Sequence, residues 1–381
     1  MATNWMERGS DMTSKKISAA KVKFENVGKI FGEKHALTSI NFTIDPGSFV
    51  VLLGPSGSGK TTLLRCLAGI ERPSSGSIFI NGTSVVGESG YLPPEKRDLA
   101  MVFQDYALWP HLTVRKNIGF PLNNSELSKT SKVERIDNLL ERVGISHLAE
   151  RYPNQLSGGE QQRVALARAL AAEVGLILFD EPLSNLDADR RESLRIEIAT
   201  LTRESGATAL YITHDQSEAF ALADKVGVLN QGELVQLDTP ENIYSNPVNA
   251  FVTRFTGVAG EFSIKEFKKV GDSRVEAYLP FAPNITIEAM KIGKLPSDSN
   301  PSLFIRSAGV SIFPETNEEG VPGEIRDVAF NGRGYEHVVK VGATEMLTKV
   351  YSKKRFDRGA NVKVTLDPSS CFVINPEKEE Q

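Results

Sequence analysis

A glycine-rich loop that follows an apolar run carries the most specific chemical signal of the chain. It reads Gly54, Pro55, Ser56, Gly57, Ser58, Gly59, Lys60, Thr61 and Thr62. Glycines at this spacing let backbone N–H groups turn inward around a polyphosphate, and the helix that follows presents its positive end to the same anion. In such a loop the Lys60 ammonium can reach the terminal phosphates, and the Thr61 hydroxyl can ligate Mg²⁺. The pattern predicts a phosphate-binding loop, and a plain Gly/Ser-rich turn is the alternative.

Two acidic residues, Asp180 and Glu181, follow a second apolar run. The run, Leu176–Phe179, is typical of a buried strand, and α/β sheets bind their ligands at the carboxyl ends of such strands. We expect Asp180 to hold Mg²⁺, directly or through water. Its neighbour Glu181 is the candidate general base that polarises an attacking water. An acidic turn without function is the alternative for this pattern alone.

A third segment, Leu-Ser-Gly-Gly-Glu-Gln at 156–161, opens a stretch rich in Gln, Arg and Ala. A serine and two glycines at the start of a helix offer free N–H groups to an anion. Because Ser157 is also a good N-cap residue, simple helix capping explains this segment equally well when it is taken alone.

Apolar periodicity predicts the elements that must position these segments. Residues 21–44 alternate in two runs, which indicates two antiparallel strands around Gly32. Continuous apolar runs predict buried strands at 48–53, 174–179 and 208–213, the last ending at His214-Asp215. We expect helices from the glycine-rich loop to near Gly69, over much of 105–175 including 159–172, and over 186–205. Strands that alternate with helices predict a parallel α/β sheet.

The pattern changes near residue 258, where short alternating runs separated by Gly, Pro, Asn and Asp begin. Apolar or aromatic side chains at 335, 337, 339 and 341, and again at 362, 364 and 366, alternate with other neighbours. Short strands at even spacing predict a small β-barrel domain.

Composition narrows the class of protein. The 381 residues are 40% hydrophobic and 24% charged, as in ordinary globular proteins, and the net charge of -4 gives no global case for binding nucleic acid or anionic lipid. No apolar run approaches the roughly 18–20 residues that a spanning helix needs, and the polar N-terminus lacks a signal-peptide core. We expect a cytoplasmic chain with a flexible tail at 1–20, and two cysteines, Cys66 and Cys371, without a disulfide framework; Cys66 is expected to be a buried hydrophobe.

Taken in order, these motifs resemble the full motif set of ABC nucleotide-binding domains. The set comprises the loop 54–62, Gln104, the segment 156–161, the strand ending in Asp180-Glu181, Ser184-Asn185-Leu186-Asp187, and His214. The resemblance implies an α/β P-loop NTPase domain at 21–257 with a helical subdomain at about 105–175. The remainder, 258–381, resembles the β-barrel (OB/TOBE-like) extension of importer ATPases for iron, polyamines, sugars and oxyanions, which has a regulatory role.

The resemblance assigns a role to each matching residue. It implies ATP and Mg²⁺ as ligands, with Thr61, Gln104 and Asp180 at the metal, and Glu181, His214 and Gln104 as catalytic groups. Phe31 stands where an aromatic side chain stacks on adenine, with a core position as the alternative. The remaining nucleotide contacts implied are Gly54, Pro55, Ser56, Gly57, Ser58, Gly59, Lys60, Thr62, Ser157, Gly158, Gly159, Gln161 and Asp187.

The family also implies partners. Residues 156–161 cap the ATP of an opposing subunit, so two chains form a head-to-tail homodimer around two ATP molecules. Residues 105–114, with Trp109 and His111, resemble the surface that grips an integral-membrane permease, and a core position in the helical subdomain is their alternative. A solute-binding protein would be an indirect partner, and the location would be peripheral at the cytoplasmic face of the cell membrane. The block at 93–122 resembles iron, polyamine and sugar importers, and ferric iron is the cargo we favour.

One stretch departs from the family. Importers of this group often carry Arg-Pro-Glu in the C-terminal domain, whereas the chain has Ile305-Arg306-Ser307-Ala308-Gly309. The arginine is kept, and the regulatory or dimer contacts of the proline and glutamate are not carried over.

Three other functions remain as alternatives. An exporter ATPase fits poorly with the β-rich extension. A soluble ABC-type ATPase acting on ribosomes or DNA often has two cassettes or long coiled coils, and the chain has one motif set and no sustained heptads. A nucleic-acid-binding barrel would use Lys349, Lys353, Lys354 and Arg355 with Tyr351 and Phe356, and a solvated basic face explains the same residues. We expect no nucleic acid partner.

Overall fold

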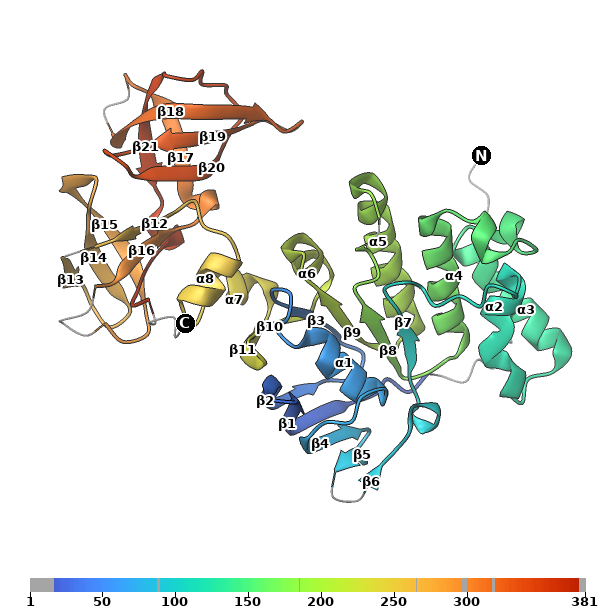
Figure 1. Ribbon diagram of the computed structural model, residues 1–381. Helices are drawn as coiled ribbons and strands as arrows, with labels where there is room; N and C mark the ends of the chain where they lie inside the picture. Colours follow the sequence, from blue (N-terminus) through green and yellow to red (C-terminus); the bar gives the residue numbers. More distant parts are fainter. Residues whose placement is uncertain are drawn as a thin grey trace, which may run out of the picture. The chain divides into compact units, whose positions relative to one another are not determined.

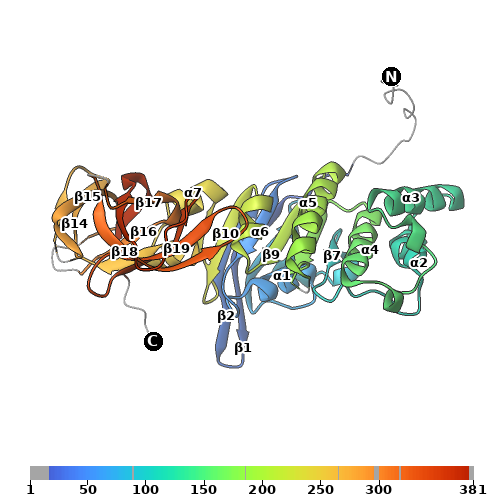
Figure 2. The same cartoon turned by 90° about the horizontal axis from the view of Figure 1, so that it is seen from above.

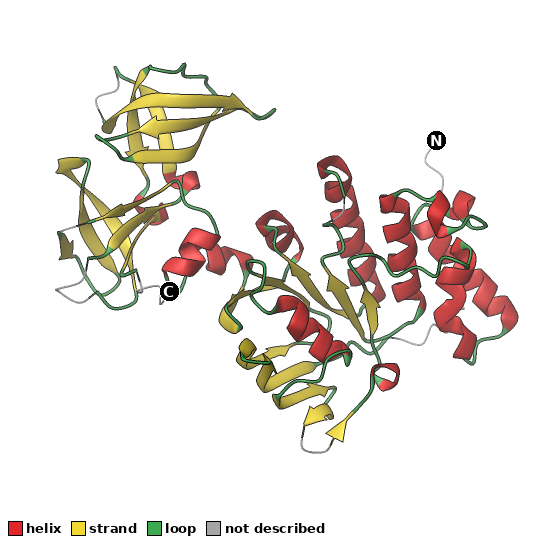
Figure 3. Cartoon of the chain, viewed as in Figure 1, coloured by secondary structure: helices red, strands yellow, loops and turns green. Residues whose placement is uncertain are grey.

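The computed structural model describes residues 17–376, apart from 88–89, 185, 265, 296–299 and 317–318. Most of the predicted tail at 1–20, and Asn185 of the Ser184–Asp187 motif, therefore lie outside the described residues. The chain divides into two compact units between Leu234 and Val235. The first unit combines strands with helices, and the second is built mainly of strands (Figures 1 and 3).

The central sheet has the strand order β11-β10-β3-β9-β8-β7, and all of its strands except most of β11 belong to the first unit. The neighbours from β10 to β7 run parallel. Every residue of β3, β8 and β9 is buried, and burial on both faces accounts for their continuous apolar sequences. The strands are β3 (Phe49–Leu53), β7 (Ala100–Val102), β8 (Leu176–Asp180), β9 (Thr208–Thr213), β10 (Lys225–Asn230) and β11 (Glu233–Asp238).

A second, antiparallel sheet of the first unit has the order β2-β1-β4-β5-β6. Its strands are β1 (Val22–Phe31), β2 (Lys34–Ile44), β4 (Ser75–Ile80), β5 (Thr83–Gly87) and β6 (Gly90–Tyr91). Strands β1 and β2 form the predicted hairpin, and Gly32 supplies a positive φ of 59° in its turn. The three short strands from β4 to β6 have no counterpart in the sequence-based assignment.

Helices connect these strands, and three of the helices form a separate layer at one end of the first unit. They are α1 (Lys60–Ala68), α2 (Val114–Gly119), α3 (Lys129–Arg142), α4 (Gly158–Ala171), α5 (Ala188–Ser205) and α6 (Gln216–Leu222). In both Figure 1 and Figure 2, α2 and α3 lie beside α4, and these three helices occupy the predicted helical segment. The N-caps are polar, with Thr113, Ser128, Ser157, Asp187 and Asp215 at the starts of α2 to α6. Short 3₁₀ turns lie at Pro94–Lys96, Phe120–Asn124, Ser146–Leu148 and Pro153–Gln155.

The parallel order of the central sheet explains how distant motifs reach one site. Strands β3, β8 and β9 lie side by side, and all three point the same way. Their carboxyl ends deliver Gly54, Asp180 and His214 to one edge of the sheet, which is where α/β folds bind ligands. The predicted α/β fold with a helical layer is therefore confirmed.

The second unit contains two sheets that share one hydrophobic core. The six-stranded sheet has the order β12-β16-β22-β15-β14-β13, and the five-stranded sheet has the order β17-β21-β18-β19-β20. Their strands are β12 (Gly260–Ser263), β13 (Phe267–Lys269), β14 (Arg274–Leu279), β15 (Ala282–Ile292), β16 (Ser302–Ile305), β17 (Val310–Pro314), β18 (Val321–Phe330), β19 (Tyr335–Lys340), β20 (Met346–Ser352), β21 (Asn361–Leu366) and β22 (Cys371–Ile374). Short strands after residue 258 thus agree with the pattern of alternation. 3₁₀ turns lie at Ser307–Gly309 and Pro368–Ser370.

Two short helices, α7 (Pro240–Ser245) and α8 (Ala250–Phe255), also belong to the second unit, although they precede the change of pattern at 258. Arg306 accounts for this. Its guanidinium, which is 1% exposed, donates to the carbonyl oxygens of Tyr244, Thr253 and Gly257 at 2.7–2.8 Å. It also lies over the Tyr244 ring at 4.3 Å. The arginine retained from the family pattern thus fastens both helices to the strands of this unit.

Among the side chains that the second unit buries between its strands is a titratable one, His337 on β19. Its Nδ1 lies 3.3 Å from the Val350 carbonyl oxygen, and its Nε2 accepts the Phe356 N–H at 3.2 Å. Burial lowers the pKa of His337, so the unfolded chain binds more protons than the folded chain just below pH ~6.5. Stability therefore rises with pH through that window and is lost as the pH falls.

We expect His337→Gln to remove this dependence, because glutamine can keep one donor and one acceptor but does not titrate. Hydrogen exchange of β19 and β20 in the full chain, compared at matched pH and corrected for intrinsic rates, measures it. Wild-type protection should fall between pH ~7.5 and pH ~5.5, and the variant should change little across the same range. Equal pH profiles for the two proteins would show that another group is responsible.

Both cysteines are fully buried and free, and burial raises the pKa of each thiol to about 12. The interpretation of Cys66 as a buried hydrophobe is confirmed. None of the helices within the described residues has both the length and the apolarity to cross a bilayer.

Candidate functional site

The glycine-rich loop joins β3 to α1, and two of its glycines are required by geometry. Gly59 is the N-cap of α1 with a φ of 103°, and a Cβ there would lie 2.5 Å from the Ala36 carbonyl oxygen. A Cβ at Gly54 would collide with the carbonyl oxygen of Leu229. The backbone can therefore approach its neighbours closely only without side chains, and α1 begins with no side-chain cap on its free N–H groups.

Lys60 is the first residue of α1 and is 4% exposed. Its Nζ donates to the carbonyl oxygens of Gly54 and Pro55 at 2.8 and 3.0 Å, so the ammonium is held inside the loop. Burial lowers the pKa of Lys60, while the charges of Glu181 and Asp180 oppose that shift. A cation held among these groups is placed to meet phosphate oxygens.

Two of the three predicted metal ligands, Thr61 and Asp180, lie together. Asp180, the last residue of β8, is 4% exposed, and its carboxylate accepts a hydrogen bond from the Thr61 hydroxyl. Burial raises the pKa of Asp180, and the nearby Arg65 and the hydrogen bond from Thr61 oppose the shift. A hydroxyl and a carboxylate are hard oxygen donors that, with phosphate oxygens and water, suit Mg²⁺.

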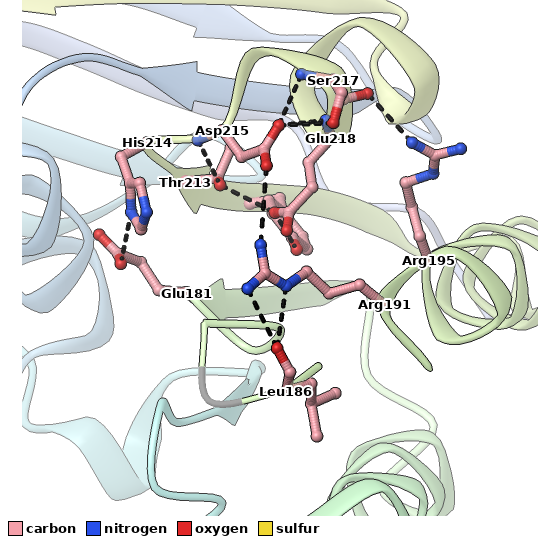
Figure 4. A network of polar contacts seen from close by, with 10 residues as sticks. Glu181, Leu186, Arg191, Arg195, Thr213, His214, Asp215, Ser217 and Glu218 are labelled. Atoms are coloured by element: carbon pink, nitrogen blue, oxygen red, sulfur yellow. Dashed lines mark hydrogen bonds and ion pairs between the residues drawn. The ribbon is translucent and has the colours of Figure 1, made fainter. Parts of the chain in front are cut away.

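Glu181 and His214 form the predicted catalytic pair. Nδ1 of His214 lies 3.0 Å from Oε2 of Glu181 (Figure 4). The Glu181 side chain is 19% exposed and that of His214 is 58% exposed. Glu181 has a positive φ of 43°, which a side-chain-bearing residue rarely adopts, and its N–H donates to the Ile212 carbonyl oxygen at 3.2 Å. The bend turns its carboxylate away from the strand toward the histidine.

Gln104, which follows β7, is linked to the same group through Ser184. The amide of Gln104 donates to the Ser184 hydroxyl at 3.2 Å, and that hydroxyl donates to the Glu181 carbonyl oxygen at 2.9 Å. The structure therefore links Gln104 to the Glu181 backbone through Ser184, and contacts of Gln104 with Mg²⁺ and the attacking water stay a prediction.

A cavity of about 370 Å³ reaches the glycine-rich loop and Glu181, whereas Gly54, Pro55, Gln104, Asp180 and His214 are not among its lining residues. It is lined by Phe31, Lys34 and Ala36, by the loop Ser56–Thr62 and by Glu181. Phe31, at the end of β1, is 46% exposed, so the alternative of a core aromatic is wrong. The cavity thus brings three groups together. The aromatic face suits the base of a nucleotide, the glycine-rich loop suits its phosphates, and the carboxylate suits a water that attacks them.

The predicted segment 157–161 lies apart from this cavity, since none of its residues is among the lining within the described part of the chain. Ser157 caps α4, and its N–H and hydroxyl donate to Oε2 of Glu160 at 2.7 and 2.8 Å. The Gln161 amide donates to the carbonyl oxygens of Pro153 and Leu156. Gly158 and Gly159 form the first turn of α4. The capping role is thus observed, and among the described residues no hydrogen bond or ion pair links the segment to the phosphate-binding loop.

Asp187 also stays outside the cavity. Its carboxylate caps α5 by accepting the Arg190 N–H at 3.1 Å, and its side chain is 62% exposed. Its Oδ2 lies 3.5 Å from Nε of Arg190, so the exposed carboxylate is paired within its own helix.

Three contributors were not predicted from the sequence: Lys34 and Ala36 in the cavity, and Arg191, which contacts the loops on both sides of the base. Lys34 and Ala36 carry no motif signal, because their place follows from the pairing of β1 with β2. Arg191 lies four residues after Asp187 on α5, one helical turn away, and that spacing was the available signal.

Aromatic side chains gather on the surface of the helical layer. Trp109 is 43% exposed, and its ring lies 6.2 Å from His111 and 5.4 Å from Phe120. The fully buried Asn117 holds this turn, since its amide donates to the carbonyl oxygens of Trp109 and Leu112 and its carbonyl accepts the Trp109 N–H. The core alternative for Trp109 is wrong, and the cluster is a surface.

The basic stretch of the second unit is less suited to nucleic acid than its sequence suggests. Phe356 is 8% exposed, and Arg355 pairs with Asp357 at 2.8 Å. Of the two aromatic side chains in this stretch, Tyr351 is exposed and Phe356 is buried. One stacking side chain is a weak platform for bases.

Family models match the chain in both units. A model described as "ABC transporter" matches residues 37–184, and a model described as "TOBE domain" matches residues 303–374. The first match contains the phosphate-binding loop, the segment 157–161 and the Asp180-Glu181 pair.

Relatives match most of the chain. The "Fe(3+) ions import ATP-binding protein FbpC" of Escherichia coli O157:H7 is 38% identical over 354 residues, which cover 93% of the chain and 97% of that protein. Its namesake in Brucella abortus is 47% identical over 85% of the chain and 89% of its own length. The "Spermidine/putrescine import ATP-binding protein PotA" of Chromobacterium violaceum is 47% identical over 62% of the chain and 65% of its own length.

Two solved structures resemble the chain over little more than half its length. The structure of cbiO1 from Clostridium perfringens, part of the ABC transporter complex cbiONQ, has a TM-score of 0.53 and 30% identity, covering 58% of the chain and 89% of cbiO1. The dimeric ATP-binding cassette MJ0796 bound to ADP and Pi has a TM-score of 0.50 and 33% identity, covering 57% of the chain and 98% of MJ0796.

Proposed function

The chain belongs to the ATP-binding subunits of ABC importers, and on that premise we propose that it powers a ferric-iron importer through two ATP sites, each shared between two copies of the chain. Like the family, it hydrolyses ATP to drive transport. The observation that carries the proposal is the cavity lined by Phe31, the loop Ser56–Thr62 and Glu181.

ATP fits this cavity with each part beside a matching group. The adenine stacks on the exposed Phe31 ring. The phosphates enter the loop, where backbone N–H groups at the start of α1 and the Lys60 ammonium donate to their oxygens. Thr61 and Asp180 would hold Mg²⁺, which offsets the charge of the phosphates during transfer.

Hydrolysis then needs one water and one base. The oxygen of the water bonds to the γ-phosphorus while Glu181 accepts a proton from that water. The bond between the γ-phosphorus and the β–γ bridging oxygen breaks, which gives ADP and phosphate. Nδ1 of His214, 3.0 Å from the Glu181 carboxylate, orients that carboxylate and has its other nitrogen for the γ-phosphate. Gln104 senses the same site through Ser184.

A second chain completes each site. The segment Ser157–Gln161 does not line the cavity of its own chain. The N–H groups at the start of α4 suit the γ-phosphate of an ATP bound by an opposing subunit. Asp187, exposed beside Leu186, faces that same partner. The dimer closes when ATP supplies anionic contacts to both chains and opens after hydrolysis removes them.

We expect Ser157→Arg to leave ATP binding by the single subunit within about twofold and to lower ATP turnover at least ~100-fold, because the larger cation occupies the place of the opposing phosphate. Ser157→Ala is the matched control, since it also removes the helix cap but adds no bulk. Calorimetry with ATP and a phosphate-release assay measure both effects. Full turnover by Ser157→Arg would contradict a role for this segment in the partner's site.

The aromatic cluster of Trp109, His111 and Phe120 supports a docking site for an integral-membrane permease. Exposed aromatic side chains on a turn fixed by Asn117 suit a protein interface. The chain would therefore lie peripherally at the cytoplasmic face of the cell membrane, with a solute-binding protein as an indirect partner and no nucleic acid partner.

Ferric iron is the cargo that similarity over nearly the full chain supports, and polyamine import is the second candidate because of the 47% identity to PotA. Uptake of ferric iron and of spermidine can be measured in native cells that lack the chain. We expect iron uptake to fall, to return with the wild-type chain, and to stay low with Glu181→Gln. Loss of spermidine uptake with normal iron uptake would instead assign polyamine as the cargo.

A further inference from the structure

One arginine contacts two loops, the one that follows Glu181 and the one that contains His214. Arg191 is in the first turns of α5, and its side chain reaches back to the residue before the helix N-cap. Its Nε and Nη2 donate to the Leu186 carbonyl oxygen at 3.1 and 3.0 Å. Its Nη1 lies 3.9 Å from Oδ2 of Asp215 (Figure 4). Arg191 therefore spans from the Ser184–Asp187 loop to the His214–Asp215 loop.

The Asp215 carboxylate is fixed for this contact. Its Oδ1 accepts the N–H groups of Ser217 and Glu218 at 2.7 and 3.2 Å and so caps α6, which leaves Oδ2 for Arg191. Burial favours a raised pKa, but the hydrogen bonds from Ser217 and Glu218 and the charge of Arg191 leave the pKa of Asp215 lowered. An ionised carboxylate at the start of a helix thus faces the arginine.

Hydrogen bonds tie the ends of the His214–Asp215 loop together, from β9 to α6. The hydroxyls of Tyr211 and Thr213, at the end of β9, donate to Oε2 of the buried Glu218 at 2.9 and 2.8 Å. These bonds join β9 to the first turn of α6, and the histidine lies between them in the chain. The Ser184–Asp187 loop is held from its other side by Ser184, which bonds both Gln104 and the Glu181 backbone.

We infer that Arg191 is a positioning residue that keeps the Ser184–Asp187 loop in register with His214 and Glu181. The inference rests on the proposed function, in which the first loop faces the partner subunit and the second pair acts on ATP. Through Arg191, a displacement of the partner-facing loop reaches the histidine of the same chain. Arg191 and Asp215 have side chains 38% and 31% exposed, so their pairing contributes little to folding and its loss should appear mainly in turnover.

Arg191→Gln tests the inference against a control one turn later on the same helix. The control is Arg195→Gln. Like Arg191, Arg195 donates to a backbone carbonyl oxygen, that of Ser217, and lies against a carboxylate, that of Glu192. With the purified full chain, we expect Arg191→Gln to lower kcat by about 10-fold, as misplaced catalytic groups do, and to change nucleotide affinity by less than about twofold. Arg195→Gln should leave both values unchanged. Equal values for the two variants would overturn the inference.

Two further variants separate positioning from charge and from folding. Asp215→Asn keeps an oxygen that can cap α6 but removes the charge, and it should lower kcat as Arg191→Gln does. The double variant should fall no further than Arg191→Gln, because that change already removes the pair with Asp215. Arg191→Lys keeps the charge but not the fork on Leu186, so it should not restore turnover. Multiplying effects in the double variant, or full rescue by lysine, would overturn the inference.

The same assay separates this inference from the function on which it rests. Wild-type chain without ATP hydrolysis would contradict the proposed function itself and the inference with it. Normal hydrolysis by the wild type, together with an unchanged Arg191→Gln, would contradict only the positioning role.

Discussion

Glu181→Gln is expected to bind ATP as the wild type does and to lower kcat by about 10²- to 10⁴-fold. The amide has nearly the size of the carboxylate but accepts no proton from water. Asp180, Thr61 and Lys60, which hold the metal and phosphates in the proposed mechanism, are left in place. Since the γ-phosphate then persists, the variant should accumulate as an ATP-bound dimer. Sedimentation with ATP and with ADP, beside a phosphate-release assay, measures both consequences.

Glu192→Gln is the matched control, because it makes the same exchange at an exposed carboxylate on α5 that pairs with Arg195. It should turn over ATP as the wild type does and should not be trapped as a dimer. Wild-type turnover by Glu181→Gln would show that another group takes the proton. A dimer that forms equally with ADP would show that the γ-phosphate does not close it.

Lys60→Ala is expected to weaken ATP binding by at least ~30-fold, the effect of removing one member of a buried, hydrogen-bonded charge pair. The Lys60 ammonium is enclosed by its own loop and carries the positive charge closest to the phosphates in the proposed complex. Calorimetry with ATP gives the affinity. Because the change also removes the bonds to Gly54 and Pro55, thermal unfolding of the variant must accompany the titration.

Lys34→Ala is the control for charge alone. Lys34, the first residue of β2, lines the same cavity and is exposed. Its loss should weaken ATP by no more than about fivefold, the effect of an exposed charge pair. If Lys60→Ala binds ATP with wild-type affinity while it remains folded, the glycine-rich loop is not the phosphate site.

The parts of the site that sequence predicts are those made by contiguous residues. The loop 54–62 and the pair Asp180-Glu181 each carry their own pattern, and apolar runs before them indicate the strands that end there. Parallel order then requires the two to meet at one edge of a sheet. The approach of His214 to Glu181 follows from the same order, because β9 neighbours β8.

Contacts that depend on side-chain direction could not be predicted in this way. Arg191 bonds a carbonyl group at Leu186, and every residue has a carbonyl group, so no residue type marks the acceptor. The second unit shows a similar limit. Alternation predicts strands there, but not that β15 pairs in parallel with β22, which follows it by some eighty residues, nor that two sheets share a core. The binding of α7 and α8 by Arg306 depends on carbonyl acceptors as well.

The shared ATP site is the central claim, and cross-linking between two differently tagged copies tests it most directly. One copy carries Ser157→Cys and the other Ser56→Cys, both in the Glu181→Gln background, and both positions are exposed. The native Cys66 and Cys371 are fully buried with raised pKa values, so a short bifunctional thiol reagent should not reach them. We predict a cross-link in the mixture with ATP, and none with ADP or with either copy alone. Cross-links within a single type of copy, or none in the mixture with ATP, would contradict a site built head to tail from two chains.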